Sequence, residues 1–163
     1  ELARLESAGD VLRGPVDLAC VVTALVAQLD PLALARGSRI RVVVEHPGSF
    51  AGDIVSLREA IRNLIFNAIH HTQEGATIVV TCGPGTSVTV DDDGPGLPAG
   101  DVSRLFEPFV RGATSASGGG LGLAIVKQVA AMHGGNVEAG SSPLGGARFR
   151  MSFNDEAVQA RAG

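Results

Sequence analysis

The chain has 163 residues, of which 45% are hydrophobic, and a net charge of −4. This length and apolar content predict one folded domain with a sizeable core and argue against disorder. The acidic balance and the absence of a Lys/Arg cluster disfavour a nucleic-acid surface, and no apolar run approaches the ~18 residues of a membrane span.

Hydrophobic periodicity predicts three helices. Apolar residues recur at helical spacing over 18–36, and Gly37 follows as a stop. Asp53 is expected to cap a second helix that runs to about residue 71, and a third is expected over about 121–133.

Short β-branched runs between turn residues predict the strands. Tight turns join most of them, so we expect a mixed, mostly antiparallel sheet. With about three helices on one face, this is an α+β two-layer sandwich. A small-residue stretch at about 97–119 has no steady period and is typical of a lid. The expected extended segments are 14–18, 40–46, 77–82, 86–91, 136–141 and 147–153.

Two asparagines on the second helix need a reason. Asn63 and Asn67 are four residues apart and share one helical face, with His70 and His71 close by. Helix interiors disfavour Asn, so a polar site wall is at least as good an interpretation as a solvated face. Amide oxygens suit a hard cation such as Mg²⁺ that also takes phosphate oxygens.

The glycine-rich run GGGLGL (118–123) opens the third helix, where backbone N–H groups can approach an anion. The run lacks the glycine spacing of a dinucleotide fingerprint or a P-loop, so by itself a flexible hinge is an equal alternative. No zinc spacing occurs among the cysteines and histidines. Cys20 and Cys82 are expected to be reduced thiols in the core.

Two further segments complete the set. DDDGPGL (91–97) follows a strand with three acids and two glycines, and LFEPFVR (105–111) carries Phe106 and Phe109 ahead of Arg111. The phenylalanines either tether the lid to the core or accompany Arg111 as a phosphate donor, and both interpretations are compatible.

In order, N-x-x-x-N-A, D-x-G-x-G, F-x-x-F-x-R and G-x-G-L-G-L resemble the N box, first glycine box, F box and second glycine box of sensor histidine kinases. The match covers about residues 15–153. The chain therefore resembles the catalytic ATP-binding domain of a bacterial two-component kinase. That domain belongs to the superfamily shared with DNA gyrase, mismatch-repair and heat-shock chaperone ATPases, with a Bergerat-type fold.

The resemblance implies a role for each matching residue. Asp92 would accept the adenine amino group, with Gly94 and Gly96 letting the base approach the backbone; Asp91 and Asp93 are expected to be solvated and replaceable. Asn67 would bind Mg²⁺ and Asn63 would face the phosphates. Arg111 would lie near the β- and γ-phosphates. The second glycine box would contact the triphosphate through Gly118, Gly120, Leu121, Gly122 and Leu123.

The chain departs from the family pattern at two positions. His70 stands where the family usually has Lys or Arg, so phosphate binding is expected to be weaker or pH-sensitive, while His71 is expected to contact ribose or phosphates. Ala147 stands where a Thr often helps to hold a water at the adenine. Neither change argues for an inactive enzyme.

The implied reaction transfers the γ-phosphate of ATP to a histidine on a helical dimerisation domain, which then passes it to a response-regulator receiver domain. ELARLES (1–7) resembles the end of that helical domain, so 1–13 are assigned to it or to a linker, 14–153 to the ATP-binding domain and 154–163 to a disordered tail. None of the four histidines has the context of the acceptor. The parent is expected to be an inner-membrane sensor with this domain in the cytoplasm and not itself inserted.

Two rival functions stay open from the sequence. A serine kinase of the anti-sigma-factor type has the same fold, and a non-catalytic nucleotide-binding docking module would only transmit signals. The residues ahead of Glu1 would distinguish the first rival, and phosphorylation of a histidine would exclude the second.

Overall fold

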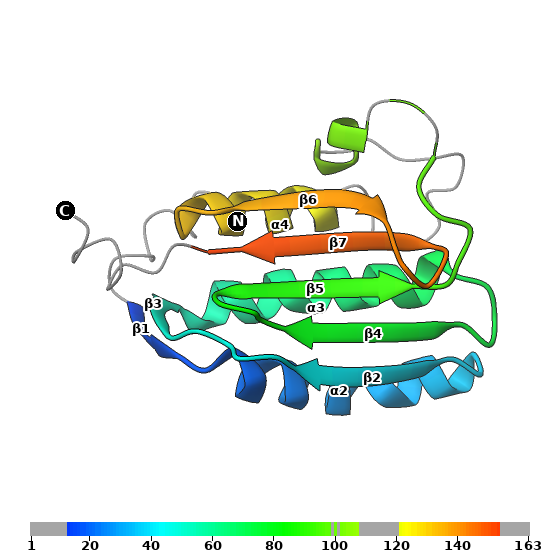
Figure 1. Ribbon diagram of the computed structural model, residues 1–163, viewed down its shortest axis with the longest axis horizontal. Helices are drawn as coiled ribbons and strands as arrows, with labels where there is room; N and C mark the ends of the chain where they lie inside the picture. The colour runs from blue at the N-terminus through cyan, green and yellow to red at the C-terminus, as the bar shows by residue number, and fades with distance from the viewer. Residues whose placement is uncertain (1–12, 99, 101, 108–120, 154–163) are drawn as a thin grey trace.

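The computed structural model describes residues 13–98, 100, 102–107 and 121–153. The elements in these ranges agree closely with the expected order of helices and strands (Figure 1). They are β1 (Arg13–Val16), α2 (Leu18–Ala35), β2 (Arg39–Val44), β3 (Phe50–Asp53), α3 (Ile54–His71), β4 (Thr77–Cys82), β5 (Ser87–Asp92), a short 3₁₀ helix η1 (Val102–Phe106), α4 (Leu121–Met132), β6 (Asn136–Ser141) and β7 (Ala147–Ser152).

Five strands form the main sheet in the order β2-β4-β5-β7-β6. The β2–β4 pair is parallel and the three other pairs are antiparallel, which confirms the mixed, mostly antiparallel prediction. Hairpin turns impose the β4–β5 and β6–β7 pairs, whereas β5 and β7 pair although they are far apart in the chain; the parallel β2–β4 pair requires a crossover, which contains α3. Figure 1 shows the three helices on one face of this sheet.

The helix boundaries follow local capping chemistry. Asp53 caps α3 as expected, because its side chain accepts a hydrogen bond from the amide of Val55 at 3.1 Å. At the end of α2, Gly37 has φ +71°, a left-handed conformation that glycine adopts without steric cost. The sequence therefore determined both boundaries through single residues.

The core lies between the helices and the sheet and is mainly aliphatic; its aromatic members are Phe50, Phe106, Phe149 and Phe153. Alternating residues of the central strands point into it, and α3 contributes one continuous apolar stripe. The largest fully buried side chains of this stripe are Leu57, Ile61, Leu64, Ile65 and Ile69.

Helix α2 is apolar along most of its length. By length and composition alone it could cross a membrane, so it comes closer to a span than the sequence analysis expected. However, seven of its side chains are buried between α3 and the sheet. A helix in the core of a folded domain meets the same criteria of length and composition as a membrane span.

Three features differ from the sequence-based expectations. Strand β3 was not predicted, because FAGD carries little β-propensity; it forms a separate two-stranded sheet with β1. The 3₁₀ helix η1 lies in the expected lid, where no regular element was predicted. Cys20 is exposed rather than in the core, whereas Cys82 is buried; both thiols are free.

Candidate functional site

Four elements meet at one end of the molecule. Strand β5 ends there at Asp92, α3 ends at His71, β7 begins at Ala147 and α4 begins at Leu121 (Figure 1, right). Antiparallel pairing of β5 with β7 brings the end of one strand beside the start of the other. Asp92 and the start of β7 therefore lie side by side although they are far apart in sequence.

Asp92 is held at this end by the backbone. Its Oδ1 accepts hydrogen bonds from the amides of Gly94 at 2.9 Å and Ala147 at 3.0 Å, and its main-chain oxygen accepts from Gly146 at 3.1 Å. The residue is 5% exposed. Within the described part of the chain, Oδ2 has no hydrogen-bond partner, so one carboxylate oxygen is fixed and the other can accept from a ligand.

Glycines make this arrangement possible. A Cβ on Gly146 would overlap Oδ1 of Asp92, so only glycine fits there, and a Cβ on Gly94 would lie 2.8 Å from Cγ2 of Thr72. Gly96 has φ +86°, which favours glycine. The sequence analysis missed Gly146 and Thr72; the GG pair ahead of the last strand is the signal that could have pointed to Gly146.

The two predicted asparagines lie on the side of α3 that faces α4. Both are half-buried, and a Cβ on Gly122 would lie 4.0 Å from Cγ of Asn63. The polar face of α3 is therefore adjacent to the first turn of α4, whose backbone N–H groups have no partner within the helix. Amides and free N–H groups together can hold a phosphorylated ligand.

A divalent cation at this site would be held by side-chain amide oxygens of the protein and by oxygens of the bound phosphorylated ligand. Among the described residues, no group of three or more His, Cys, Asp or Glu side chains could hold a metal ion. Mg²⁺ commonly takes only one or two protein ligands and completes its shell with phosphates and water. The donor set, led by Asn67, therefore fits Mg²⁺ that arrives with a nucleotide, and does not fit zinc.

His70 is partly withdrawn from solvent at the end of α3. Its ring packs on Phe66, with centroids 4.1 Å apart, and its Nε2 is buried with no hydrogen-bond partner among the described residues. Burial lowers the pKa of His70, and the positive charge of Arg36 lowers the pKa further. The imidazole is therefore mainly neutral at pH 7. His71 is exposed beside it.

The two aspartates that flank Asp92 differ from their expected state. Asp91 is not solvated: it is 5% exposed, and its carboxylate is 2.7 Å from Nε of Arg148. A side chain on the opposite strand, invisible to local sequence reasoning, buries it. Asp93 is half-buried and accepts from the amide of Thr77 at 2.9 Å, which joins the end of β5 to the start of β4.

The described part of the lid is anchored to the core. Phe106 is buried and meets Phe149 edge-on, with ring centroids 6.1 Å apart, as the tethering interpretation predicts. Leu123 packs against the core and Gly122 is half-buried, both on α4, which begins at Leu121. The predicted residues Arg111, Gly118 and Gly120 lie outside the described residues.

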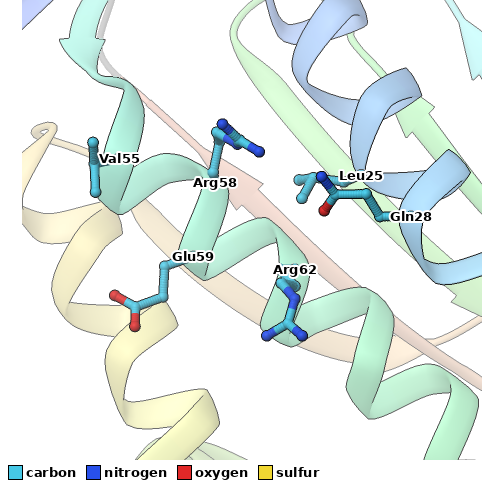
Figure 2. Close-up of a pocket in the computed structure, with 6 residues that line it drawn as sticks. All are labelled: Leu25, Gln28, Val55, Arg58, Glu59 and Arg62. Carbon is cyan, nitrogen blue, oxygen red and sulfur yellow. The ribbon is translucent and has the colours of Figure 1, made fainter.

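A separate cavity of about 300 Å³ lies between α2 and α3 (Figure 2). None of its lining residues belongs to the predicted site. Arg58 and Arg62 lie one helical turn apart on its rim, which gives it a mildly basic character. It is lined by Leu25, Gln28, Val55, Arg58, Glu59 and Arg62.

Comparison with known proteins decides the family. The model of the histidine kinase-, DNA gyrase B- and HSP90-like ATPases matches residues 52–157, well over half of the chain. The chain belongs to this ATPase family. This confirms the resemblance drawn from the four sequence motifs.

Relatives within the family narrow the comparison to sensor kinases. The chain is 47% identical over 98 residues to the sensor-type histidine kinase PrrB of Mycobacterium tuberculosis, a match that covers 57% of this chain and 22% of PrrB. The chain thus spans about a fifth of that relative.

Solved structures agree on the fold of this family member. The ATP-binding domain of PrrB from M. tuberculosis superposes with a TM-score of 0.66 at 27% identity, covering 88% of this chain and 98% of that domain. The mycobacterial sensor histidine kinase MprB gives a TM-score of 0.73 at 28% identity, covering 86% and 97% of the two chains. The two-layer sandwich predicted from sequence is therefore the architecture of histidine kinase ATP-binding domains.

Proposed function

We propose that this chain binds ATP together with Mg²⁺ and donates the γ-phosphate to a histidine on the helical dimerisation domain of its own sensor kinase. The receiver domain of a response regulator would then take the phosphoryl group. The observation that carries the proposal is Asp92, whose Oδ1 is fixed by two backbone amides while Oδ2 is left to accept a ligand amino group.

In this proposal the base of the nucleotide lies against Asp92, Gly94 and Gly96, and the phosphates extend toward α3 and the start of α4. ATP is an elongated ligand, with an amino group at one end and negative charge at the other. His70, His71 and the second glycine box are proposed to contact the ribose or the phosphates, and Arg111 to neutralise charge near the transferred group.

Bound Mg²⁺ would neutralise phosphate charge during transfer, with Asn67 as its protein ligand. The chain's own contribution is positioning and exclusion of water. Asn63 cannot act as a general base, because a side-chain amide does not take up a proton near neutral pH. An amide at this position favours transfer to an oriented acceptor over hydrolysis by water.

His133 is not suited to be the acceptor histidine. His133 is 4% exposed, and its two ring nitrogens contact the amide of Asp53 at 3.0 Å and the oxygen of Val129 at 2.8 Å. A group buried and bonded on both nitrogens cannot attack a phosphate. We propose that the acceptor lies in the helical domain of the parent, which we place in the bacterial inner membrane with this domain in the cytoplasm.

Mixing the chain with the helical domain of its parent and γ-labelled ATP tests the proposal. We expect label on the helical domain that is lost in acid and kept in base, as a phosphohistidine requires. Acid-stable label would indicate a serine kinase instead. Nucleotide binding with no label transferred would support a docking module, and no binding of ATP at all would overturn the proposal.

A further inference from the structure

On the opposite face of the sheet from Asp92, Asp91 and Arg148 form a bidentate ion pair. Nε of Arg148 donates to Oδ1 of Asp91 at 2.7 Å, and Nη2 donates to Oδ2 at 3.1 Å. The guanidinium fork therefore engages both carboxylate oxygens, which fixes orientation as well as distance. The two residues are direct partners in the β5–β7 register.

The pair lies at the end of the β5–β7 register that is next to the candidate site. Asp91 opposite Arg148 is the last paired position of β5 and β7 before the candidate site. One residue further along each strand stand Asp92 and Ala147, whose Oδ1 and amide nitrogen are 3.0 Å apart. Beyond the ion pair, the two strands are joined by the contacts of Asp92 itself.

Strand geometry places the two carboxylates back to back. Successive side chains of a strand point to opposite faces; Val88 and Val90 of β5 lie in the core beneath the helices, so Asp92 faces the helix layer and Asp91 faces the other side. Each face of the sheet thus carries one contact between β5 and β7 next to the candidate site. Any shift of β7 along β5 would break both contacts together.

We propose that Asp91 and Arg148 are positioning residues for Asp92. They clamp the start of β7 so that the amides of Gly146 and Ala147 stay aimed at Asp92, which keeps its Oδ2 directed at the adenine. The inference rests on the proposed ATP site. It gives the buried carboxylate of Asp91 a function, which is to keep Asp92 in position.

Simple stabilisation of the sheet is a poorer account of the pair. The side chain of Arg148 is 43% exposed, and an ion pair with one partner in contact with water adds little to stability, so the value of this pair lies in its geometry. Position 150, two residues along β7 on the same face, carries an exposed arginine for which the described structure shows no ion pair. The bidentate ion pair thus occurs at the paired position closest to the site.

Calorimetric titration of the whole chain with ATP and Mg²⁺ tests the proposal, using Asp91→Asn, Arg148→Lys and the control Arg150→Met. We expect Asp91→Asn to weaken ATP about tenfold, equivalent to about 1.4 kcal/mol. The affinity for ADP should fall by the same factor, because the variant disturbs the adenine end of the site, which both nucleotides share. Arg148→Lys, which keeps the charge but loses the fork, should also bind more weakly, and Arg150→Met should stay within about twofold.

A spectroscopic readout separates positioning from stability. In amide NMR spectra, the Gly146 and Ala147 signals should shift or broaden in Asp91→Asn while the protein stays folded, and should be unchanged in Arg150→Met. Equal ATP affinity in folded Asp91→Asn and wild type would overturn the inference, as would an equal loss in the control. If Asp91→Asn does not fold, Arg148→Lys decides by the same criteria. Failure of the wild type to bind ATP would instead refute the proposed function.

Discussion

The amide nitrogen of Ala147 lies 3.0 Å from Oδ1 of Asp92, across a separation of 55 residues in the chain. Because the donor is a backbone group, the contact does not depend on the side chain at position 147. It directs the carboxylate while leaving Oδ2 available, and it explains why the middle acid of DDDGPGL can serve as a ligand although it is buried.

Asp92→Asn should abolish recognition of the adenine amino group while preserving the fold. The amide oxygen can still accept from Gly94 and Ala147, but an NH₂ group then replaces Oδ2, and a donor would face a donor. We expect ATP affinity to fall by about 10- to 100-fold, the cost of an unsatisfied buried group of about 1–3 kcal/mol. Isothermal titration calorimetry measures this directly.

Asp93→Asn is the matched control for that variant. Its amide oxygen can keep the hydrogen bond from Thr77 at the adjacent position of the same turn. ATP affinity should therefore stay within about twofold of wild type. If Asp92→Asn and Asp93→Asn bind ATP equally well, the assignment of the base-binding carboxylate is wrong.

Gly146→Ala should damage the same site sterically. The new methyl group would overlap Oδ1 of Asp92 and crowd the amide of Gly94, so the start of β7 must move. We expect a loss of about 1–3 kcal/mol in the free energy of unfolding by urea, together with weaker ATP binding. Gly140→Ala on β6 is the control, because its added Cβ has no neighbour within 4 Å. Equal stability of the two variants would contradict the close approach at Gly146.

Sequence reasoning succeeded where structure depends on local chemistry. The cap at Asp53, the stop at Gly37 and the turn between β4 and β5 are each set by residues a few positions apart. The three helices followed from apolar periodicity. The ordered motifs, rather than any single one, predicted the family.

Sequence reasoning failed where the structure depends on partners far away in the chain. Asp91 looked like a solvated turn residue, because the arginine that pairs with it comes 57 residues later. Strand β3 was missed because pairing with β1, and not the propensity of FAGD, makes it a strand. Gly146 was overlooked because its reason lies in the carboxylate beside it.

Asn67→Ala should uncouple nucleotide binding from Mg²⁺. If the amide oxygen of Asn67 is the protein ligand, ATP affinity measured with Mg²⁺ and with EDTA should converge in the variant, whereas in the wild type Mg²⁺ should strengthen binding. Asn67→Asp restores a harder oxygen ligand and should recover the Mg²⁺ dependence. An unchanged ratio of the two affinities in Asn67→Ala would exclude the metal role.

His70 should make the stability of the fold sensitive to mild acid. Burial beside Phe66 and the charge of Arg36 lower its pKa below the ordinary value of 6.5. As the pH falls through 6.5, the unfolded chain therefore takes up a proton that the folded chain resists. Because the unfolded state then binds more protons than the folded state, the free energy of unfolding decreases as the pH decreases below 6.5. Above pH 6.5 this effect of His70 disappears.

His70→Gln removes this proton linkage and tests it. Urea unfolding between about pH 5 and 8 should show the wild type losing stability relative to His70→Gln on the acid side, with a constant difference on the basic side. His46→Asn is the control: it removes a histidine from a turn with φ +47°, a conformation that Asn tolerates. It should leave the acid-side decline in place, because that decline comes from protonation of His70, which burial and then the charge of Arg36 disfavour in the folded state. Parallel curves for wild type and His70→Gln would show that another group governs the decline.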